Sequence, residues 1–421
     1  MHRLAGLILA LVAGAADAAP PMRCASAGPP TYASLHECTR AMAQPLQRRE
    51  ALLAIDAADI EASRAAHGQM LAFIEAELGR YDEALAAYPF SPKANPPQPP
   101  PAPATHVAVA AAPAIAALAS ERRIVLVNEA HHDAATRQLT LELLPLLRNV
   151  GFTHFAAETL DAADRGLARR RYPTAASGGY TDEPLYAEIV REALRLGYVL
   201  VAYEAAGSGN DPQAREDGQA GNLKARVFDV DPAARLFVHA GYAHVDKSAS
   251  PRLFGVDTMA VRLKALTGFD PLSIDQTLLR SWGAARESPT TTTLIDTFAP
   301  IGPSVLVERD SGMPWSAAPQ WHDISVLLPR PTCDSVRPHW LRLGGARKAW
   351  TIPRRLCGST LPCSVEARHH GEPDEAIPAD RHAFVEAGRR AALYLRPGRY
   401  RVQAFDRDGA ALVRPRTIHI H

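Results

Sequence analysis

The stretch that most constrains the fold of this chain is residues 124–150, IVLVNEAHHDAATRQLTLELLPLLRNV. Its first four residues form a short, largely β-branched apolar run, which is typical of a strand buried on both faces of a sheet. Apolar residues then recur at helical spacing, and Gly151 follows as a helix stop. The stretch therefore predicts a strand, a short turn and an amphipathic helix, the repeating unit of an α/β sheet.

The turn of this unit carries ionisable side chains. Glu129 and His131 follow the strand directly, and His132 and Asp133 come next. Placing acids and imidazoles between a buried strand and its helix costs free energy unless they bind or react with something. Asp133 has a structural explanation as the N-cap of a helix that begins near Ala134. His132 is left open, so Glu129 and His131 are the candidate functional residues of the turn.

The same pattern recurs at three later strands. The segments between them include a helix over residues 184–196 and, after a polar loop, a helical segment over residues 222–228. Strands that alternate with helices indicate a mostly parallel sheet with helices on both faces. In such a sheet the carboxyl ends of the strands share one edge, where ligands bind. The strands and the ionisable residues that follow them are residues 153–157 with Glu158, residues 198–203 with Glu204, and residues 235–238 with His239 and His244.

A cleft of carboxylates and imidazoles suits two kinds of chemistry. Such side chains bind Mn²⁺, Zn²⁺, Co²⁺ or Fe, which polarise a carbonyl group or lower the pKa of a bound water. Without a metal, an imidazole held by a carboxylate acts as a general base toward water. The sequence fixes neither the distances between these side chains nor their protonation, so both kinds of chemistry stay open. The candidate metal ligands are Glu129, His131, Glu158, His239 and His244.

Four short motifs occur in a fixed order within residues 106–277. They are Glu129-Ala130-His131 after the first strand, Glu158 after the second, the segment REDGQAGNL that begins at Arg215, and HAGYAHV from His239 to Val245. Together they resemble the superfamily that contains erythromycin esterases, ChaN-like haem-binding proteins and TIKI metalloproteases. The resemblance covers only the predicted α/β part of the chain.

The resemblance implies a site made of Glu129, His131 and Glu158, closed by His244, with Arg215 as a cation. In the esterases the histidine activates water, in the TIKI branch the matching residues hold a divalent metal, and in the ChaN-like branch the protein binds haem. The family usually has glycine where this chain has Asn128. Only about 45 residues separate Glu158 from Glu204, too few for the large helical lid of the esterases.

These observations lead to one hypothesis with two alternatives. The first is an exported, metal-assisted hydrolase of an ester or amide, with a small-molecule or peptide ligand. Its predicted catalytic residues are Glu129, His131, Glu158, Arg215 and His244. The second is a non-catalytic haem- or iron-binding envelope protein, in which Tyr203 or Tyr242 holds the haem iron. The third treats the α/β part as a scaffold and the C-terminal part as an adhesion module.

The chain divides by composition into five parts. Residues 1–18 resemble a signal peptide, with an apolar segment and the cleavage pattern Ala16-Asp17-Ala18. Residues 19–88 are Ala-rich and helical, and residues 89–105 form a Pro-rich linker. Residues 106–353 form the α/β domain. Residues 354–421 alternate in short runs with Pro-Gly turns, which predicts a small antiparallel β-sandwich.

Charge and cysteine content narrow the partners and the compartment. Lys and Arg (46) nearly balance Asp and Glu (45), so we expect no nucleic-acid partner. After signal removal we expect no membrane span, which places the mature chain in the periplasm or outside the cell. Five cysteines suit disulfide formation there. Cys24 and Cys38 form one expected pair. Among Cys333, Cys357 and Cys363, the most local pair is Cys357–Cys363, and Cys333 competes for it.

Overall fold

The computed structural model describes residue 24 and residues 30–90, 98–205, 207, 211–280, 287–332 and 337–421. The expected signal peptide, part of the Pro-rich linker and Cys333 lie outside these residues.

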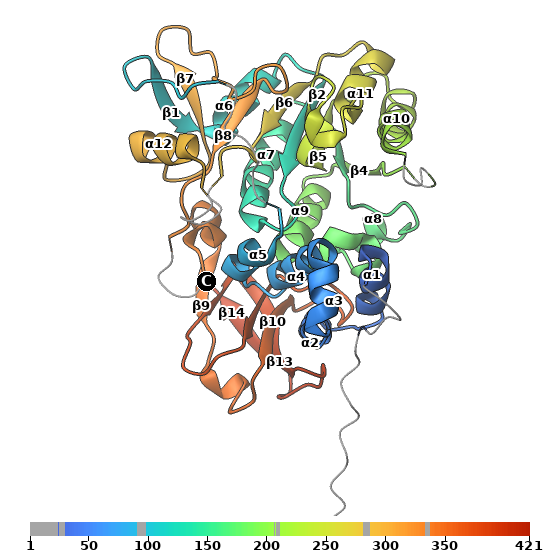
Figure 1. Ribbon diagram of the computed structural model, residues 1–421, viewed down its shortest axis with the longest axis vertical. Coiled ribbons are helices and arrows are strands. Elements are labelled where there is room, and N and C mark those ends of the chain that lie inside the picture. The colour runs from blue at the N-terminus through green and yellow to red at the C-terminus, as the bar shows by residue number, and fades with distance from the viewer. Residues whose placement is uncertain are drawn as a thin grey trace, which may run out of the picture.

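An eight-stranded sheet forms the centre of the α/β part (Figure 1). Neighbouring strands from β8 to β4 run parallel, whereas β7 is antiparallel to both β1 and β8. The sheet is therefore mostly parallel, as predicted. In spatial order its strands are β1 (His106–Ala110), β7 (Ser304–Glu308), β8 (Ile324–Leu327), β6 (Leu272–Asp275), β2 (Ile124–Glu129), β5 (Leu236–Gly241), β3 (His154–Ala157) and β4 (Val199–Ala202).

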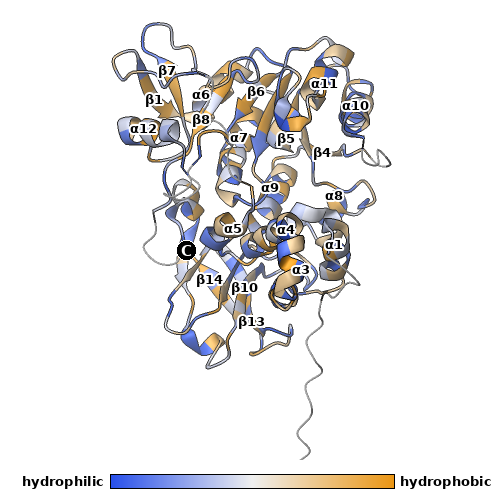
Figure 2. Cartoon of the chain, in the orientation of Figure 1, coloured by the Kyte–Doolittle hydropathy of each residue, from blue (hydrophilic) through white to orange (hydrophobic). Residues whose placement is uncertain are grey.

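Helices cover both faces of this sheet, because the side chains of a buried strand alternate between two apolar layers. Val125 and Val127 of β2 pack in one layer, whereas Ile124 and Leu126 pack in the other. Figure 2 shows apolar residues along these strands. The first layer contains α6 (Ala111–Ala119), α7 (Gln138–Asn149) and α9 (Pro184–Arg195), and the second contains α10 (Pro212–Leu223) and α11 (Met259–Thr267). A further helix, α12 (Pro289–Phe298), packs near β8.

Three element boundaries that position site residues differ from the sequence-based expectation. Strand β2 continues to Glu129, so Glu129 is the last residue of the strand and does not belong to the turn. The helix expected over residues 222–228 instead begins at Pro212, because Asp211 caps it by accepting from the backbone N–H groups of Gln213 and Ala214. Arg215 therefore lies on a helix and not in a loop. Strand β5 continues to Gly241, so His239 lies inside the strand and not after it.

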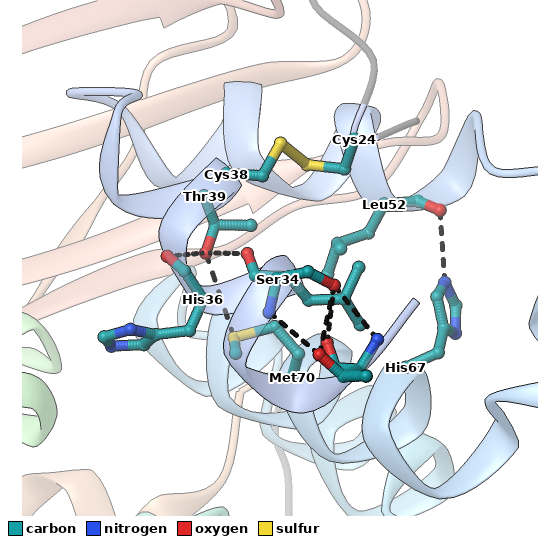
Figure 3. The surroundings of a disulfide bond; sticks show 10 residues. Cys24, Ser34, His36, Cys38, Thr39, Leu52, His67 and Met70 are labelled. Carbon is teal, nitrogen blue, oxygen red and sulfur yellow. Dashed lines mark hydrogen bonds between the residues drawn. A yellow bond between two sulfur atoms is a disulfide. The ribbon is translucent and has the colours of Figure 1, made fainter. Parts of the chain in front are cut away.

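The N-terminal helices lie between the α/β part and the C-terminal strands (Figure 1). The Cys24–Cys38 disulfide ties the start of the described chain to the first helix (Figure 3), as expected from the sequence. These helices have an apolar core of their own that includes Leu35, Leu46 and Ile74. They are α1 (Tyr32–Arg40), α2 (Pro45–Leu53), α3 (Ala57–Ala62), α4 (Arg64–Glu77) and α5 (Tyr81–Ala87).

The C-terminal part consists of two small antiparallel sheets around one apolar core, in agreement with the predicted β-sandwich. The four-stranded sheet has the order β11-β10-β13-β14, and the two-stranded sheet pairs β12 with β9. Cys357 and Cys363 form a disulfide. The strands are β9 (Lys348–Thr351), β10 (Cys363–His369), β11 (Asp380–Phe384), β12 (Ala392–Leu395), β13 (Gly398–Asp406) and β14 (Arg416–Ile420).

Within the described part of the chain, no helix combines the length and the apolar character needed to cross a bilayer.

Candidate functional site

The order of the central strands brings the predicted site residues together. Strand β5 lies between β2 and β3, and Glu129 of β2 is in register with Gly241 of β5. Glu158 follows β3, and its backbone N–H donates to the carbonyl of His239. The strand ends therefore converge at one edge of the sheet, as the parallel topology requires.

Glu129 holds His131 in a buried pair. Glu129 Oε1 lies 2.7 Å from His131 Nδ1, and Arg137 Nε donates to Glu129 Oε2 over 2.8 Å. His239 Nε2 lies 3.2 Å from the same Oε2, and His239 Nδ1 bonds to Thr140. Burial alone raises the pKa of Glu129, but Arg137 and His239 outweigh it and hold the pKa well below its usual value. Glu129 is therefore ionised.

The imidazole of His131 packs against Tyr180 and Gly241. The Tyr180 ring stacks on it with 4.0 Å between ring centroids. Gly241 also lies against the ring, because a Cβ atom there would come within 2.4 Å of His131 Cε1 and Nε2. Real Cβ atoms do not approach so closely, so position 241 must be glycine for this ring position. Together these contacts fix both the place and the tilt of the imidazole.

Glu158 forms a second charged group beside His131. Arg215 Nη2 donates to Glu158 Oε1 over 2.9 Å, and the Gly241 N–H donates to Oε2 over 2.5 Å. Oε2 is 4.0 Å from His131 Nε2, too far for a direct hydrogen bond. Burial raises the pKa of Glu158, but His244, His131 and Arg215 together lower it to about 2.

His244 connects Glu158 to a carboxylate that the sequence did not indicate. Its Nδ1 is 2.8 Å from Glu216 Oε1, and its Nε2 is 3.6 Å from Glu158 Oε1. Burial lowers the pKa of His244, but these two carboxylates raise it above its ordinary value. Glu216 is in turn fixed by the N–H of Met259. Once α10 is known to begin at Pro212, its buried face includes Glu216, so a correct helix start would have identified it.

Arg215 is shared between two strand ends. It donates through Nε to Glu204 Oε1 over 3.0 Å and through Nη2 to Glu204 Oε2 over 2.6 Å, as well as to Glu158. Its Nη1 lies 3.2 Å from His244 Nε2. Arg215 therefore joins the ends of β3 and β4 to His244, although the side chains of Arg215 and Glu204 are each about one-third exposed.

The two remaining residues of the first turn point elsewhere. Asp133 accepts from the N–H of Ala135, which confirms its predicted role as a helix cap, although the helix begins with a 3-10 turn. The ring of His132 stacks on Tyr88 at 3.5 Å, and its Nδ1 bonds to the Tyr242 hydroxyl over 3.1 Å. His132 thus docks the end of the N-terminal helices onto the α/β part.

Arg137 has two carboxylate partners, Glu129 and Glu183, and the sequence indicates neither pairing. Arg137 Nη1 donates to Glu183 Oε2 over 2.7 Å, and both side chains are almost fully buried. Glu183 also caps α9 through the N–H of Tyr186. An acid just before a helix looks like an ordinary cap in the sequence, so nothing there indicates that it reaches the Glu129 pair.

A cavity of about 230 Å³ lies next to His131. His131 and Arg137 line it together with residues of the segment 175–183, which includes Tyr180, and residues of α1, α2 and α4 line the rest. The N-terminal helices therefore complete the site. No sequence pattern indicated this, because helical periodicity shows which face is apolar but not what it packs against.

The donor set does not fit a divalent metal. Both oxygens of Glu129 are engaged, by His131 and Arg137, and both oxygens of Glu158 are engaged, by Arg215 and the Gly241 N–H. A cation there would lie beside two guanidinium groups, which repel it. Among the described residues, no three His, Cys, Asp or Glu side chains are arranged to hold a metal ion.

The two candidate tyrosines do not fit haem either. Tyr203 is fully buried in the apolar layer beneath α10, and burial raises the pKa of its hydroxyl well above the ordinary value. The Tyr242 hydroxyl already bonds to Tyr88 and His132. An iron ligand needs a free oxygen that faces a haem-sized space, and neither hydroxyl has this environment.

No known family model matches the chain, and no curated protein matches its sequence. Parts of the chain align with the type III effector HopBA1, at 17% identity and a TM-score of 0.28 over 32% of this chain and 74% of that one. A structure described as bacterial protein toxins aligns at 16% identity and a TM-score of 0.28, over 36% of this chain and 34% of that one. RRSP, a MARTX toxin effector domain from Vibrio vulnificus CMCP6, aligns at 14% identity and a TM-score of 0.27, over 52% of this chain and 50% of that one. Likenesses this low carry no argument about function.

Proposed function

We propose that the protein is a hydrolase of an ester or amide in which His131 activates water. The observation that carries the proposal is the position of this imidazole. It is held by the buried, ionised Glu129, packs against Tyr180 and Gly241, and borders a cavity. A buried imidazole oriented by a carboxylate is the arrangement that general-base catalysis requires.

The tautomer follows from the partner of Nδ1. Because an ionised carboxylate can only accept, His131 Nδ1 carries the hydrogen that it donates to Glu129 Oε1. In the neutral imidazole, Nε2 then has a free lone pair. A water molecule can give a proton to this nitrogen while its oxygen attacks the carbonyl carbon. The imidazolium then returns the proton to the leaving alcohol or amine as the tetrahedral intermediate collapses.

The neighbouring charges support this cycle. Ionised Glu129 stabilises the imidazolium that forms at His131, and Glu158 lies 4.0 Å from Nε2, a gap that a water molecule can bridge. We assign to Arg215 the stabilisation of negative charge on the intermediate. His244 and Glu216 then act as positioning residues, because they hold Arg215 and Glu158 in place.

We also propose export to the periplasm or outside the cell. The two disulfides, Cys24–Cys38 and Cys357–Cys363, support this placement, because such bonds persist in oxidising compartments. Detection of the tagged protein in the periplasmic or extracellular fraction tests it, and retention in the cytoplasm with reduced thiols would contradict it.

The catalytic proposal is tested with purified protein on a panel of activated esters and amides. We expect His131→Gln and Glu129→Gln each to lower kcat/KM by about a hundredfold or more. His154→Gln is the matched control, because His154 is a buried histidine in the same sheet but at the opposite end of β3. Equal activity of His131→Gln and the wild type would contradict the mechanism, and an inert wild type would contradict the hydrolase itself.

A further inference from the structure

A fifth strand end lies beside the site residues at the same edge of the sheet. Strand β6 runs parallel to its neighbour β2 and ends at Asp275, which Gln276 follows directly. Both residues are fully buried, and so is Asn128 of β2. Buried polar side chains need hydrogen-bond partners, and these three bond to one another. The reaction proposed above uses none of them.

Hydrogen bonds on both sides fix the orientation of the Asn128 amide. Its Oδ1 accepts from the backbone N–H of Gln276 over 2.8 Å. Its Nδ2 donates to Asp275 Oδ1 over 2.6 Å and to the carbonyl oxygen of Tyr242 over 2.9 Å. The reversed amide would place an oxygen against both of these acceptors and a donor against the N–H. Asn128 therefore joins the end of β6 to the residue that follows β5.

Tyr242 has a backbone conformation that needs such support. Its φ is +44°, in the left-handed region that bulky residues rarely adopt. The Asn128 amide holds its carbonyl group, and hydrogen bonds with Tyr88 and His132 hold its hydroxyl group. A residue persists in a costly conformation where its surroundings fix it, and such residues cluster at functional sites. The strain at Tyr242 therefore marks the turn after β5 for closer attention.

This turn, formed by Gly241 and Tyr242, contacts both the imidazole and the carboxylate of the site. The N–H of Gly241 donates to Glu158 Oε2, and Gly241 also packs against the ring of His131. The ring of Tyr242 meets the His131 imidazole edge to face, with 5.2 Å between ring centroids and 87° between planes. A shift of the turn would therefore displace one hydrogen-bond donor of Glu158 and two neighbours of His131.

We propose that Asn128, held by Asp275, positions the Gly241–Tyr242 turn. Through this turn it sets the places of the His131 imidazole and the Glu158 carboxylate. Both residues act through the turn and not on the substrate, so they are positioning residues. The inference rests on the proposed function, because it adds two residues to that reaction. A misplacement of about 1 Å at a reacting group can cost about a hundredfold in rate.

The first experiment measures the position of the imidazole and needs no substrate. The histidine rings of the full-length protein are isotope-labelled, and the His131→Gln spectrum assigns the Cε1–H resonance of His131. We expect this resonance to shift in Asn128→Asp, because an oxygen replaces the donor that holds the Tyr242 carbonyl. The resonance of His154, at the opposite end of β3, is the control and should not move. An unchanged His131 resonance in folded Asn128→Asp would overturn the proposal.

The second experiment separates positioning from a simple tie between β2 and β6. In the double variant Asn128→Asp/Asp275→Asn the amide and the carboxylate change places, so the bond between them forms again with donor and acceptor reversed. The Thr277 hydroxyl, which donates to Asp275 Oδ1, can rotate to accept instead. The Tyr242 carbonyl, however, still lacks its donor.

We therefore expect the double variant to regain most of the Tm that Asn128→Asp loses, while the His131 resonance stays shifted. Recovery of the wild-type resonance together with the Tm would overturn the proposal, because a tie between the two strands would then be enough. A double variant that did not fold would contradict the reversed bond and, with it, the proposed pairing of Asn128 with Asp275.

The third experiment separates this inference from the hydrolase itself. On the ester and amide panel we expect Asn128→Asp and the double variant each to lower kcat about tenfold or more. KM should change little, because neither Asn128 nor Asp275 lines the cavity. Asn149→Asp, at the exposed end of α7, is the matched control and should behave as the wild type.

The outcomes of this third experiment are distinct. An inert wild type with a shifted His131 resonance in Asn128→Asp would contradict the proposed reaction and uphold the positioning of the imidazole. A shifted resonance with an unchanged kcat would uphold the reaction and overturn the role of Asn128 in it.

Discussion

At the scale of single residues, the position of the His131 ring depends on an absent side chain. A Cβ atom at position 241 would lie 2.4 Å from His131 Cε1 and Nε2 and 3.0 Å from Glu158 Oε2. We expect Gly241→Ala to displace the imidazole, to cost about 1–3 kcal/mol of folding stability, and to lower kcat by about a hundredfold. Chemical denaturation and steady-state kinetics measure the two effects.

The control for this prediction is a glycine on α10, the helix that carries Arg215. Gly221 lies in α10, and a Cβ atom there would meet no described atom within 4 Å. Gly221→Ala should therefore leave kcat unchanged and stabilise the helix by up to about 1 kcal/mol. If Gly241→Ala kept full activity, the imidazole could not be fixed by close packing against β5.

Glu158 gives a residue-scale prediction about pH. Its pKa lies at about 2 in the folded protein, against an ordinary value of 4.5 for a glutamate side chain. Because the folded value is lowered, the stabilisation is fully present above pH 4.5 and is lost as the pH falls toward 2. A difference of this size corresponds to about 3 kcal/mol. Urea unfolding at a series of pH values across this window should show the loss.

Glu158→Gln should remove that part of the pH dependence, so the free energy of unfolding should fall less steeply with decreasing pH below pH 4.5. The exposed Glu37→Gln variant is the control and should follow the wild type. A Glu158→Gln curve parallel to that of the wild type would mean that Glu158 is not ionised by its neighbours in the folded state.

At the scale of elements, the sequence predicted where the strands lie far better than it predicted which elements pack against one another. The apolar runs before Glu129 and Glu158 fall on β2 and β3, because a buried parallel strand needs apolar side chains on both faces. The start of α10 was missed, since its polar first turns show no apolar periodicity. Parallel topology was enough to bring Glu129, Glu158 and His244 together.

The cavity could not be predicted in this way. Glu77 and His131 come from segments more than fifty residues apart and meet only through the docking of α4 on the α/β part. Helical periodicity marks the apolar face of α4 but does not identify the surface that this face covers. Nor does spacing show that Arg137 lies between Glu129 and Glu183. What a sequence lacks here is the relative placement of elements, which only tertiary packing decides.

The first helix offers a prediction about the N-terminal disulfide. The Cys24–Cys38 bond holds α1, whose residues Tyr32 and His36 border the cavity. On the chain-entropy account, a closed loop of this length contributes about 3 kcal/mol. We expect the Cys24→Ser/Cys38→Ser double variant to raise KM several-fold while kcat changes little, because the Glu129–His131 pair lies outside the loop.

The second disulfide provides the control. Cys357→Ser/Cys363→Ser removes a bond in the C-terminal part whose cysteines do not line the cavity, and it should lower stability without a change in KM. Equal effects of the two double variants on KM would show that α1 does not contribute to substrate binding.

At the scale of the whole molecule, the three parts of the chain are joined by hydrogen bonds around β11 and α9. The N–H of Ala383 in β11 donates to the carbonyl of Leu78 after α4. Arg191 of α9 reaches Glu372 before β11 through two hydrogen bonds. The Tyr81 hydroxyl of α5 also donates to Glu183 just before α9. Each of the three parts therefore contacts the other two and covers some of their surface.

Such sharing of interfaces predicts one cooperative unfolding transition, because loss of one part exposes the buried surface of the next. The substitution Gly79→Ala tests this prediction where the N-terminal helices contact β11. Gly79 has a φ of +67°, and a Cβ atom there would lie 2.2 Å from the Arg381 carbonyl oxygen of β11. Calorimetry should show a single peak for the wild type, and Gly79→Ala should lower its Tm as a whole. The exposed Gly371→Ala, with open space around its Cβ position, is the control. Two resolved peaks in the wild type would mean that the parts unfold independently, and the cavity would then open without unfolding of the sheet.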